Sequence, residues 1–301
     1  MEPNTKIVRR DEALHITLMD GQVSVLMLDT TGMAQNAADT HGASPLGIAA
    51  LGRLVTACAM LSLSEKDERN AVTLQLRGDG PIGALVAVGS HAEVKAYVEH
   101  PRVSLPLKSD GKLDVGGAVG HTGRLSVIRD MGLREPYIGQ TALVSGEIAE
   151  DLCSYLLTSQ QQPSLVSLGV LVAGETVLAS GGLLIQPLPG CSDDIISQLE
   201  LRSPMFADIS REMTYDDNET LMRGWFAGMS PVIQAVTPLV YRCRCDKDRM
   251  ERALIALGDQ ELTEMIEDGK GAELSCHFCH AHYAFSTQEL EALRGIAREK
   301  P

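Results

Sequence analysis

The chain has 301 residues, of which 44% are hydrophobic and 22% are charged, and this is the composition of an ordinary globular protein. Its formal net charge of −14 argues against a nucleic-acid-binding or membrane-binding protein, because an acidic surface repels phosphate groups. The N-terminal sequence MEPNTKIVRRDEALH lacks the apolar run of a signal peptide, so we expect no secretory signal, and seven cysteines without export predict a protein of the reducing cytoplasm.

The pattern of residues 1–189 predicts a strand-rich α+β domain with at least two helices. Apolar runs on both sides of Asp20 and Gly21 predict a hairpin. A serine followed by a proline then predicts the start of a helix over residues 45–63. This segment is apolar, but Arg53 in its middle favours burial in a protein core over a membrane span.

Residues 71–100 read as three strands joined by glycine-rich turns. The first turn, from Gly78 to Gly83, matches the G-x-G-x-x-G sequence of dinucleotide-binding proteins. In those proteins a helix follows the glycines, and its N-terminus holds the pyrophosphate. Here a second strand-like run follows instead, and Pro81 removes a main-chain donor. We therefore predict a hairpin turn and no nucleotide site.

The rest of this domain is predicted from shorter signals. Residues 111–130 are expected to form a glycine-rich turn between strands, without the lysine of a phosphate-binding P-loop. An amphipathic helix is expected to begin at Ser145. Two more strands are expected over residues 164–174 and 176–188.

A change of pattern at residues 187–191 marks a boundary, and residues 190–240 are predicted to form a helical linker. Three short segments, residues 193–203, 204–213 and 217–229, are rich in methionine and aromatic side chains. Helices this short are marginal alone and need a surface to bury against. The simpler interpretation is a helical cap on the N-terminal domain. The functional hypothesis adds that this cap can detach and expose apolar surface.

Four cysteines near the C-terminus are the strongest chemical signal in the sequence. Cys243 and Cys245 form a C-x-C pair, and Cys276 and Cys279 form a C-x-x-C pair. Thiolates are strong ligands of zinc, and four of them make a closed structural site with tetrahedral geometry. The two pairs therefore predict a zinc site in a small C-terminal domain, residues 241–301.

Three other interpretations of these cysteines were weighed against zinc. Structural disulfides would need an oxidising compartment. A thioredoxin-like C-x-x-C, or a c-type haem site matching C-x-x-C-H, would leave the first pair unexplained. The histidines next to the second pair are spare donors, but four thiolates already fill a zinc shell, so we expect them at the surface. These histidines are His277, His280 and His282.

The C-terminal domain is predicted to contain three helices and a strand. Asp246 and Asp259 are expected to cap the first two helices, and Ser286 with Glu289 makes a capping box for the third. A domain of this size buries little core. A structural zinc ion supplies an apparent ~10–16 kcal/mol in small peptides. We therefore expect folding here to depend on the metal.

The thiolates that hold zinc can also be oxidised, which would remove ligands and unfold the small domain. The adjoining helical linker would then lose support, so we infer a redox-gated exposure of apolar surface. Arg242, Arg244 and Lys247 favour the thiolate form near the first pair. The remaining cysteines are expected to be inert or to add minor redox chemistry: Cys58, Cys153 and Cys191.

Over nearly its whole length the chain resembles the heat shock protein 33 family of redox-regulated chaperones. The C-x-C pair, the helical insert and the C-x-x-C pair resemble that family's zinc switch. Upstream, the stretches HGASPLGIAALGRL, LQLRGDGPIGALVA, GKLDVGGAVG, EPYIGQTALVSGEIAEDL and GVLVAG resemble its N-terminal signatures. The histidine-rich turn goes beyond what that pattern needs.

The resemblance implies a non-enzymatic chaperone of the stress response, which binds unfolding client proteins without ATP. Its four cysteines would hold zinc while reduced. Oxidation would convert Cys243–Cys245 and Cys276–Cys279 to disulfides, release the zinc and unfold the linker. The oxidised form would be a homodimer, with no nucleic-acid or membrane partner.

Two alternatives come from other functional classes. A zinc-binding nucleic-acid module is disfavoured, because residues 242–301 carry nine Lys/Arg and twelve Asp/Glu, which gives a charge of −3. A thiol–disulfide oxidoreductase that uses the C-x-x-C pair would be indicated by turnover in an insulin-reduction assay without loss of zinc.

Overall fold

The computed structural model describes residues 9–299, and within it the chain forms two compact units that meet in sequence between Arg242 and Cys243. We call them the large unit and the cysteine unit. The first residues of the predicted hairpin, and most of the N-terminal sequence considered for a signal peptide, lie outside the described range.

The first sheet of the large unit is antiparallel and has the strand order β10-β1-β2-β9-β8. β1 and β2 are joined by a tight turn over Met19–Gly21, which confirms the predicted hairpin. Alternate residues of these strands face opposite sides, so the sheet is apolar on both faces. Its strands are β1 (Glu12–Leu18), β2 (Val23–Asp29), β8 (Leu165–Ala173), β9 (Thr176–Pro187) and β10 (Val232–Pro238).

The second sheet has the order β11-β5-β4-β3-β6-β7. β3 and β4 pair antiparallel across the segment from Gly78 to Gly83, which confirms that the G-x-G-x-x-G sequence is a hairpin turn. Gly83 has a φ of +71°, which explains the need for glycine there. The strands are β3 (Ala71–Gly78), β4 (Ala84–Ser90), β5 (Glu93–Val98), β6 (Gly123–Asp130), β7 (Tyr137–Ala142) and β11 (Val240–Tyr241).

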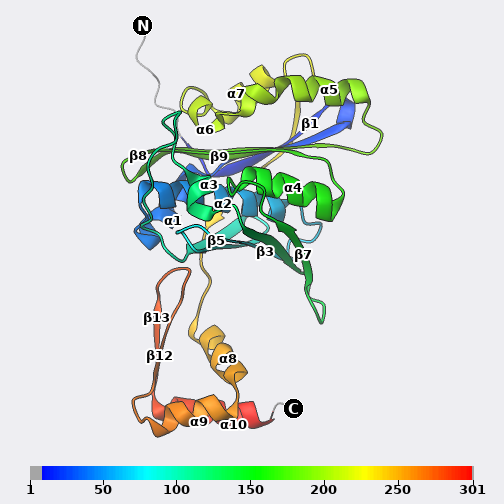
Figure 1. Ribbon diagram of the computed structural model, residues 1–301. Coiled ribbons are helices and arrows are strands. Elements are labelled where there is room, and N and C mark those ends of the chain that lie inside the picture. The colour runs from blue at the N-terminus through cyan, green and yellow to red at the C-terminus, as the bar shows by residue number, and fades with distance from the viewer. Residues whose placement is uncertain (1–8, 300–301) are drawn as a thin grey trace. The chain divides into compact units, whose positions relative to one another are not determined.

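Helix α2 (Pro45–Leu63) lies between the two sheets and contacts both (Figure 1). Ser44 accepts a hydrogen bond from the N–H of Gly47, which confirms the predicted cap. The helix is long and apolar enough to cross a membrane, but 89% of its most apolar stretch is buried inside the protein. It is therefore the central core helix, as Arg53 in its middle led us to expect. Arg53 is paired with Glu147 at the edge of this core.

Three other helices share this layer, and they differ from what the sequence predicts. α1 (Thr31–His41) was not predicted, and α3 (Val115–Val119) forms where a turn was expected, because the Asp114 carboxylate caps it. α4 (Ala149–Gln160) begins after Ile148 and not at Ser145. The reason is that the carboxylate of Asp151 accepts hydrogen bonds from the N–H groups of residues 144–146 and 148, and so holds that segment as a turn.

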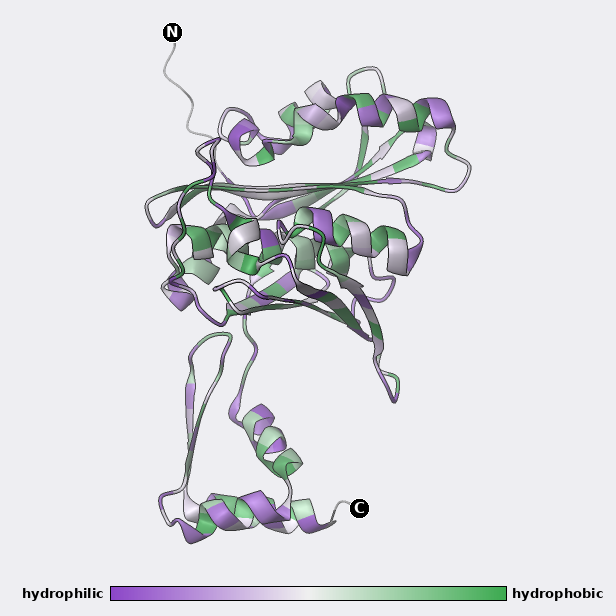
Figure 2. Cartoon of the chain, viewed as in Figure 1, coloured by the Kyte–Doolittle hydropathy of each residue, from purple (hydrophilic) through white to green (hydrophobic). Residues whose placement is uncertain are grey.

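A layer of short helices covers the other face of the first sheet (Figure 1). Each carries hydrophilic as well as hydrophobic residues (Figure 2), and the hydrophobic ones pack on the sheet. The ring centroid of Phe206 lies 5.4 Å from that of Trp225 and 5.6 Å from that of Phe226. We call this the helical cap. It consists of α5 (Asp193–Arg202), a 3-10 turn (Ser203–Phe206), α6 (Ile209–Glu212) and α7 (Asn218–Trp225).

The segment after the helical cap was expected to be helical, but it contains strand β10, which pairs with β1. Its sequence, VIQAVTP, is rich in β-branched residues, and the open edge of β1 supplies the partner. The pairing shifts register between His15 and Ile16. Most of β10 is exposed, including Val232 and Val236, so it is held mainly by its ladder.

The cysteine unit contains three helices and a two-stranded hairpin around a small core of five buried residues. Asp246 caps the first helix and Ser286 forms a capping box with Glu289, as predicted. The predicted cap at Asp259 is wrong, since Gly258 holds the cap position and Asp259 is the first helical residue. The elements are α8 (Lys247–Leu257), α9 (Asp259–Glu267), β12 (Ala272–Ser275), β13 (His282–Phe285) and α10 (Thr287–Glu299). The core residues are Leu254, Leu262, Phe285, Leu290 and Leu293.

Candidate metal centre

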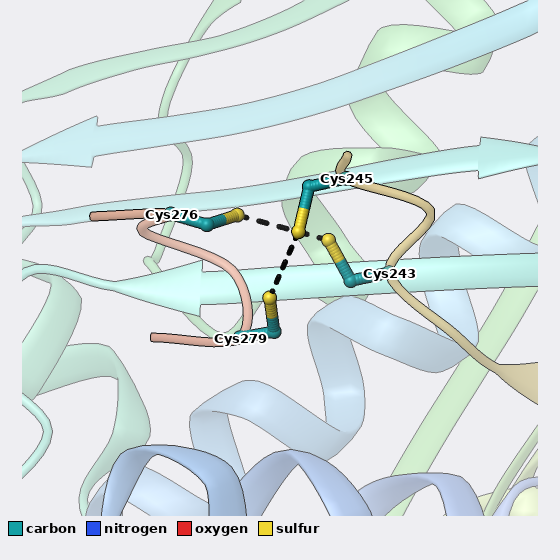
Figure 3. Close-up of side chains that lie close together, drawn as sticks. All are labelled: Cys243, Cys245, Cys276 and Cys279. Carbon is teal, nitrogen blue, oxygen red and sulfur yellow. Dashed lines mark hydrogen bonds between the residues drawn. The ribbon is translucent and has the colours of Figure 1, made fainter. Parts of the chain in front are cut away.

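Two separate turns of the cysteine unit carry the four cysteines. Cys243 and Cys245 lie in the extended segment between β11 and α8. Cys276 and Cys279 lie in the turn between β12 and β13. Their side chains point toward a common centre (Figure 3). Two short segments that are more than thirty residues apart thus bring four sulfur atoms together.

The turn between β12 and β13 is fixed by its own main-chain hydrogen bonds. The N–H of Cys276 donates to the carbonyl of Ala281 at 2.9 Å, and the N–H of His280 donates to the carbonyl of Cys276 at 2.8 Å. His280 has a left-handed φ of +57°, which reverses the chain direction. The hairpin register then starts with Ser275 opposite His282. The two sulfur atoms of this pair are therefore positioned by a rigid turn.

The separations of the sulfur atoms fit a tetrahedral metal shell. The four sulfurs all lie within 4.8 Å of one another. The Sγ atoms of Cys243 and Cys276 are 3.7 Å apart, and those of Cys245 and Cys279 are 3.2 Å apart. Four sulfurs at the usual zinc–sulfur distance of about 2.3 Å are separated by about 3.8 Å. The group can thus hold a metal ion after small movements of the side chains.

The four thiols do not share one electrostatic environment. Burial raises the pKa of Cys243 to about 12, against the lowering effect of the N–H of Cys245. Burial also acts to raise the pKa of Cys245, but hydrogen bonds from Tyr283 and the neighbouring thiols outweigh it and lower that pKa to about 7. For Cys279 burial dominates and the pKa is raised. The hydrogen bond from Tyr283 therefore favours the thiolate form at Cys245.

Tyr283 is a member of this site that the sequence analysis did not identify. Its hydroxyl donates a hydrogen bond to Cys245 Sγ at 3.2 Å. Its place in β13, four residues after Cys279, directs the ring toward the sulfurs through the hairpin register. An aromatic residue with a hydroxyl shortly after a C-x-x-C turn was the available signal.

The basic residues near the first cysteine pair have other partners in the structure. Arg242 forms an ion pair with Glu93 within the large unit. Lys247 forms an ion pair with Glu289, and its Nζ atom lies 5.1 Å from the centre of the Phe285 ring. These contacts orient Lys247 toward the core of the cysteine unit as well as toward solvent.

No histidine joins the four-sulfur group among residues 9–299. His282 lies on the exposed part of β13, and its Nδ1 atom is 3.1 Å from a carboxylate oxygen of Glu273. His280 shapes the turn through its left-handed backbone. The expectation that His277, His280 and His282 stay outside the metal shell agrees with this grouping.

The three other cysteines lie away from the group, and the described part of the chain contains no disulfide. Cys58 is fully buried in α2, and burial raises its pKa to about 12, so its thiol is poorly reactive. Cys153 donates a hydrogen bond to the carbonyl of Ser164 at 3.0 Å, and burial raises its pKa as well. Cys191 is partly buried at the end of the first sheet.

Comparisons with known proteins agree on one family. Residues 11–286 match the family model described as Hsp33 protein. The chain is 45% identical over 283 residues to the 33 kDa chaperonin of Ruminiclostridium cellulolyticum, covering 93% of this chain and 97% of that protein. It is 42% identical over 277 residues to the 33 kDa chaperonin of Bacillus subtilis, covering 91% and 95%. The crystal structure of the 33 kDa chaperonin of Thermotoga maritima superposes with a TM-score of 0.86 at 31% identity, covering 97% of this chain and all of that one.

Proposed function

Because this chain belongs to the Hsp33 family of chaperones, we propose that it is a redox-regulated holdase that works without ATP and whose switch is the four-cysteine group. The observation that carries the proposal is the convergence of four thiols in a unit with a core of only five buried residues. Such a unit gains little from burial, so a metal cross-link decides whether it folds.

We propose zinc as the metal, held by Cys243, Cys245, Cys276 and Cys279. The donor set supports zinc because four thiolates favour it over ions that prefer oxygen ligands. Zinc would supply a closed structural cross-link between the two turns. The hydroxyl of Tyr283 and the N–H groups near the sulfurs would orient the thiolates and balance part of their charge.

The proposed switch is the oxidation of each pair to a disulfide. Two thiolates give two electrons to one molecule of peroxide, which takes up two protons from the solvent and leaves as two molecules of water while a sulfur–sulfur bond forms. The pairs are Cys243 with Cys245 and Cys276 with Cys279. The short sulfur contacts of the folded unit run between the pairs, but those contacts need the fold. Within each pair only one or two residues intervene, so the partners stay close after the unit unfolds.

The helical cap is the part of the large unit that we expect to respond. Chain connectivity supplies the route, because β11 ends at Tyr241, next to the cysteine unit. β11 is two residues long and β10 is an exposed edge strand, so both are weakly held. Unfolding that begins in the cysteine unit would fray β11 and then β10, and so reach α7.

Release of the helical cap would expose two apolar surfaces at once. The cap buries the side chains of Phe206, Met213, Met222, Phe226 and Met229, and the sheet beneath buries its own apolar face. A glycine lets α6 approach the sheet closely, since a Cβ at Gly169 would meet atoms of Ile209 and Ser210 at 2.8–2.9 Å. The contacts are thus made by short helices that have little stability of their own. These surfaces are the proposed binding sites for unfolding clients.

The remaining parts of the proposal concern organisation and setting. Residues 1–189 would be the chaperone domain, residues 190–240 the metastable linker and residues 241–301 the redox switch. We propose that the protein works in the cytoplasm, forms a homodimer when oxidised, and has no enzymatic activity. Exposed apolar surface on two copies would favour association.

The test follows zinc and chaperone activity in the same sample. Zinc release would be measured with a chelating dye, and aggregation of a heat-unfolded client by light scattering, before and after peroxide at elevated temperature. We expect the reduced, zinc-loaded protein to be a poor chaperone and the oxidised protein to suppress aggregation as zinc appears in solution. Cys276→Ser should remove this response, while Cys153→Ser, as a control, should keep it. Full activity in the reduced, zinc-loaded protein would refute the proposal.

A further inference from the structure

The outer edge of β8 carries main-chain groups without a strand partner. β8 is the last strand of the first sheet, and within residues 9–299 its ladder runs only to β9. Alternate N–H and C=O groups of such a strand point outward in the plane of the sheet, where no neighbouring strand pairs with them. Proteins usually protect a long edge with a covering loop, a charge or a bulge. β8 has a register shift between Leu171 and Val172, but Leu168 to Leu171 continue as a regular strand.

A cavity of about 640 Å³ runs along this edge from Leu168 to Val172. Residues of α2 line one side of the cavity and residues of α6 line the other. The cavity therefore lies beside the edge of β8, where a further strand of the sheet would lie between these helices. The segment before α3 lines a third side. The lining residues that matter here are Ala49 and Arg53 from α2, Ser210 and Arg211 from α6, and Leu107 and Lys112 from that segment.

Five consecutive residues of β8, Leu168 to Val172, line the cavity, so a strand of about that length could pair along it. A strand added to a sheet lies about 4.8 Å from its neighbour, and five residues of extended chain span about 17 Å. Such a strand would have helical layers above and below it, as the inner strands of the sheet have. Its main chain would meet the open edge of β8, and its alternate side chains would meet α2 and α6.

Several charged side chains around the cavity form ion pairs. Lys112, in the segment before α3, forms an ion pair with Asp208, which directly precedes α6. Arg53 and Lys108 both contact the carboxylate of Glu147. The Nε atom of Arg53 is buried and has no hydrogen-bond partner in the structure. A main-chain carbonyl placed along this edge would meet the N–H groups of β8 that have no strand partner.

We propose that this cavity is a docking slot for an extended segment of an unfolding client, which adds to β8 as a further strand. The inference rests on the proposed function, because it assumes that the protein holds unfolded chains. Main-chain hydrogen bonding does not depend on the side chains of the bound segment, which suits a chaperone with many clients. One wall of the slot, α6, belongs to the helical cap, so release of the cap would widen the slot for longer segments.

The test uses the full-length, reduced and zinc-loaded protein with a fluorescent peptide of alternating valine and threonine as the probe. Ala207→Trp would fill the slot, because Ala207 is exposed and lines it. Ala227→Trp is the matched control, because Ala227 is an exposed alanine in the turn after α7 that does not line the slot. We expect Ala207→Trp to weaken peptide binding at least tenfold and Ala227→Trp to leave it unchanged. We also expect the peptide to slow hydrogen exchange at residues 168–172.

A second probe is the same peptide with its central amides N-methylated, which removes the donors of a strand but keeps the side chains. It should bind at least tenfold more weakly. Three results would each contradict the proposed slot. They are equal binding of the methylated peptide, equal binding by Ala207→Trp, and no binding of the first probe to the wild-type protein.

Suppression of client aggregation by the oxidised protein, measured in parallel, separates the two claims. If it occurs while the peptide does not bind, the slot is wrong and the holdase proposal stands. If the peptide binds as expected and aggregation is not suppressed, the slot stands and the holdase proposal is wrong.

Discussion

The two units of this protein achieve stability by different means. The large unit has two hydrophobic clusters, one between its sheets and one beneath the helical cap, and many of their residues are fully buried. The cysteine unit has a core cluster of five buried residues and four converging thiols. Burial of apolar surface stabilises the first unit, whereas the second is too small for burial alone. The proposed function uses this difference, because it joins a stable scaffold to a unit whose folding would depend on a bound metal.

The same contrast appears within the large unit, on the two faces of the first sheet. One face packs against α2, a continuous helix of 19 residues that lies almost wholly in the core. The other face packs against helices of 4 to 10 residues. Short helices contribute little stability without tertiary contacts. The sheet and α2 should therefore persist when the helical cap is released.

The largest expected difference between the two units is their response to removal of the metal. We expect a strong chelator to unfold the cysteine unit and to leave both sheets folded, because a structural zinc site supplies an apparent ~10–16 kcal/mol. Amide NMR spectra should lose the dispersed signals of residues 243–299 and keep those of β2 and β9. If the cysteine unit stays folded after the chelator has removed all of the zinc, its hydrophobic core is sufficient to keep it folded.

Equal truncations in the two cores should have unequal consequences. Leu262→Ala and Leu74→Ala each remove a fully buried side chain, at a cost of about 2–5 kcal/mol. In the cysteine unit this cost is linked to metal binding, so Leu262→Ala should lower zinc affinity by at least about thirtyfold. Leu74→Ala, in the large unit, should lower the unfolding midpoint and leave zinc affinity unchanged. Competition with a chelator of known affinity measures both, and equal zinc affinities would contradict the linkage.

The hydrogen bond from Tyr283 should have a smaller effect that is specific to the metal centre. Tyr283→Phe keeps the ring and removes the donor to Cys245. Loss of such an outer partner typically lowers metal affinity by about tenfold. We expect faster zinc release under peroxide. Alkylation of Cys245 in the zinc-loaded protein, mapped by mass spectrometry, should become faster with it, because a zinc-bound sulfur is protected from the reagent. Tyr137→Phe changes an exposed tyrosine of the large unit and is the control. Identical alkylation rates in both variants would mean that the hydroxyl does not shield the sulfur.

The smallest expected effect concerns the pH dependence of the large unit. Burial, aided by the nearby charge of Asp29, raises the pKa of Asp11 to about 6 from its ordinary value of 3.8, against the hydrogen bond from Met33. A group whose pKa is higher in the folded state stabilises the fold when protonated, so this contribution is present below about pH 4 and is lost as the pH rises through about 6.

Asp11→Asn should therefore raise the unfolding temperature of the large unit at pH 7 by about 2–4 °C, the shift for ~1 kcal/mol in a domain of this size after discounting for solvent screening. Near pH 4 the gain should vanish. Asp20→Asn, at an exposed turn position, serves as the control. Thermal melts followed by circular dichroism at both pH values give the comparison, and a gain that is independent of pH would exclude this carboxyl as the cause.

The sequence predicted the parts of this structure that depend on local signals. The hairpin at Asp20, the cap at Ser44 and the turn from Gly78 to Gly83 follow from residue types at fixed spacings. The prediction that the two cysteine pairs converge rests on the preference of zinc for four thiolate ligands. Helix α1 was missed because its sequence, TGMAQNAADTH, has a weak apolar pattern and is stabilised by packing on α2.

Features that depend on distant contacts could not be read from the sequence. β10 is a strand because β1 offers a partner more than two hundred residues earlier. The start of α4 is set by Asp151, which holds the preceding turn. The role of Tyr283 depends on the register of the β12–β13 hairpin. Each case needs the positions of residues that no local pattern specifies.

Hydrogen exchange in the oxidised and reduced protein tests the central claim most directly. Exchange would be mapped by mass spectrometry with and without peroxide at a temperature where the reduced protein is folded. We predict that oxidation removes protection from residues 243–299 and from the helical cap, while β2, β9 and α2 keep theirs. Retained protection in the helical cap after both cysteine pairs are oxidised would contradict the account.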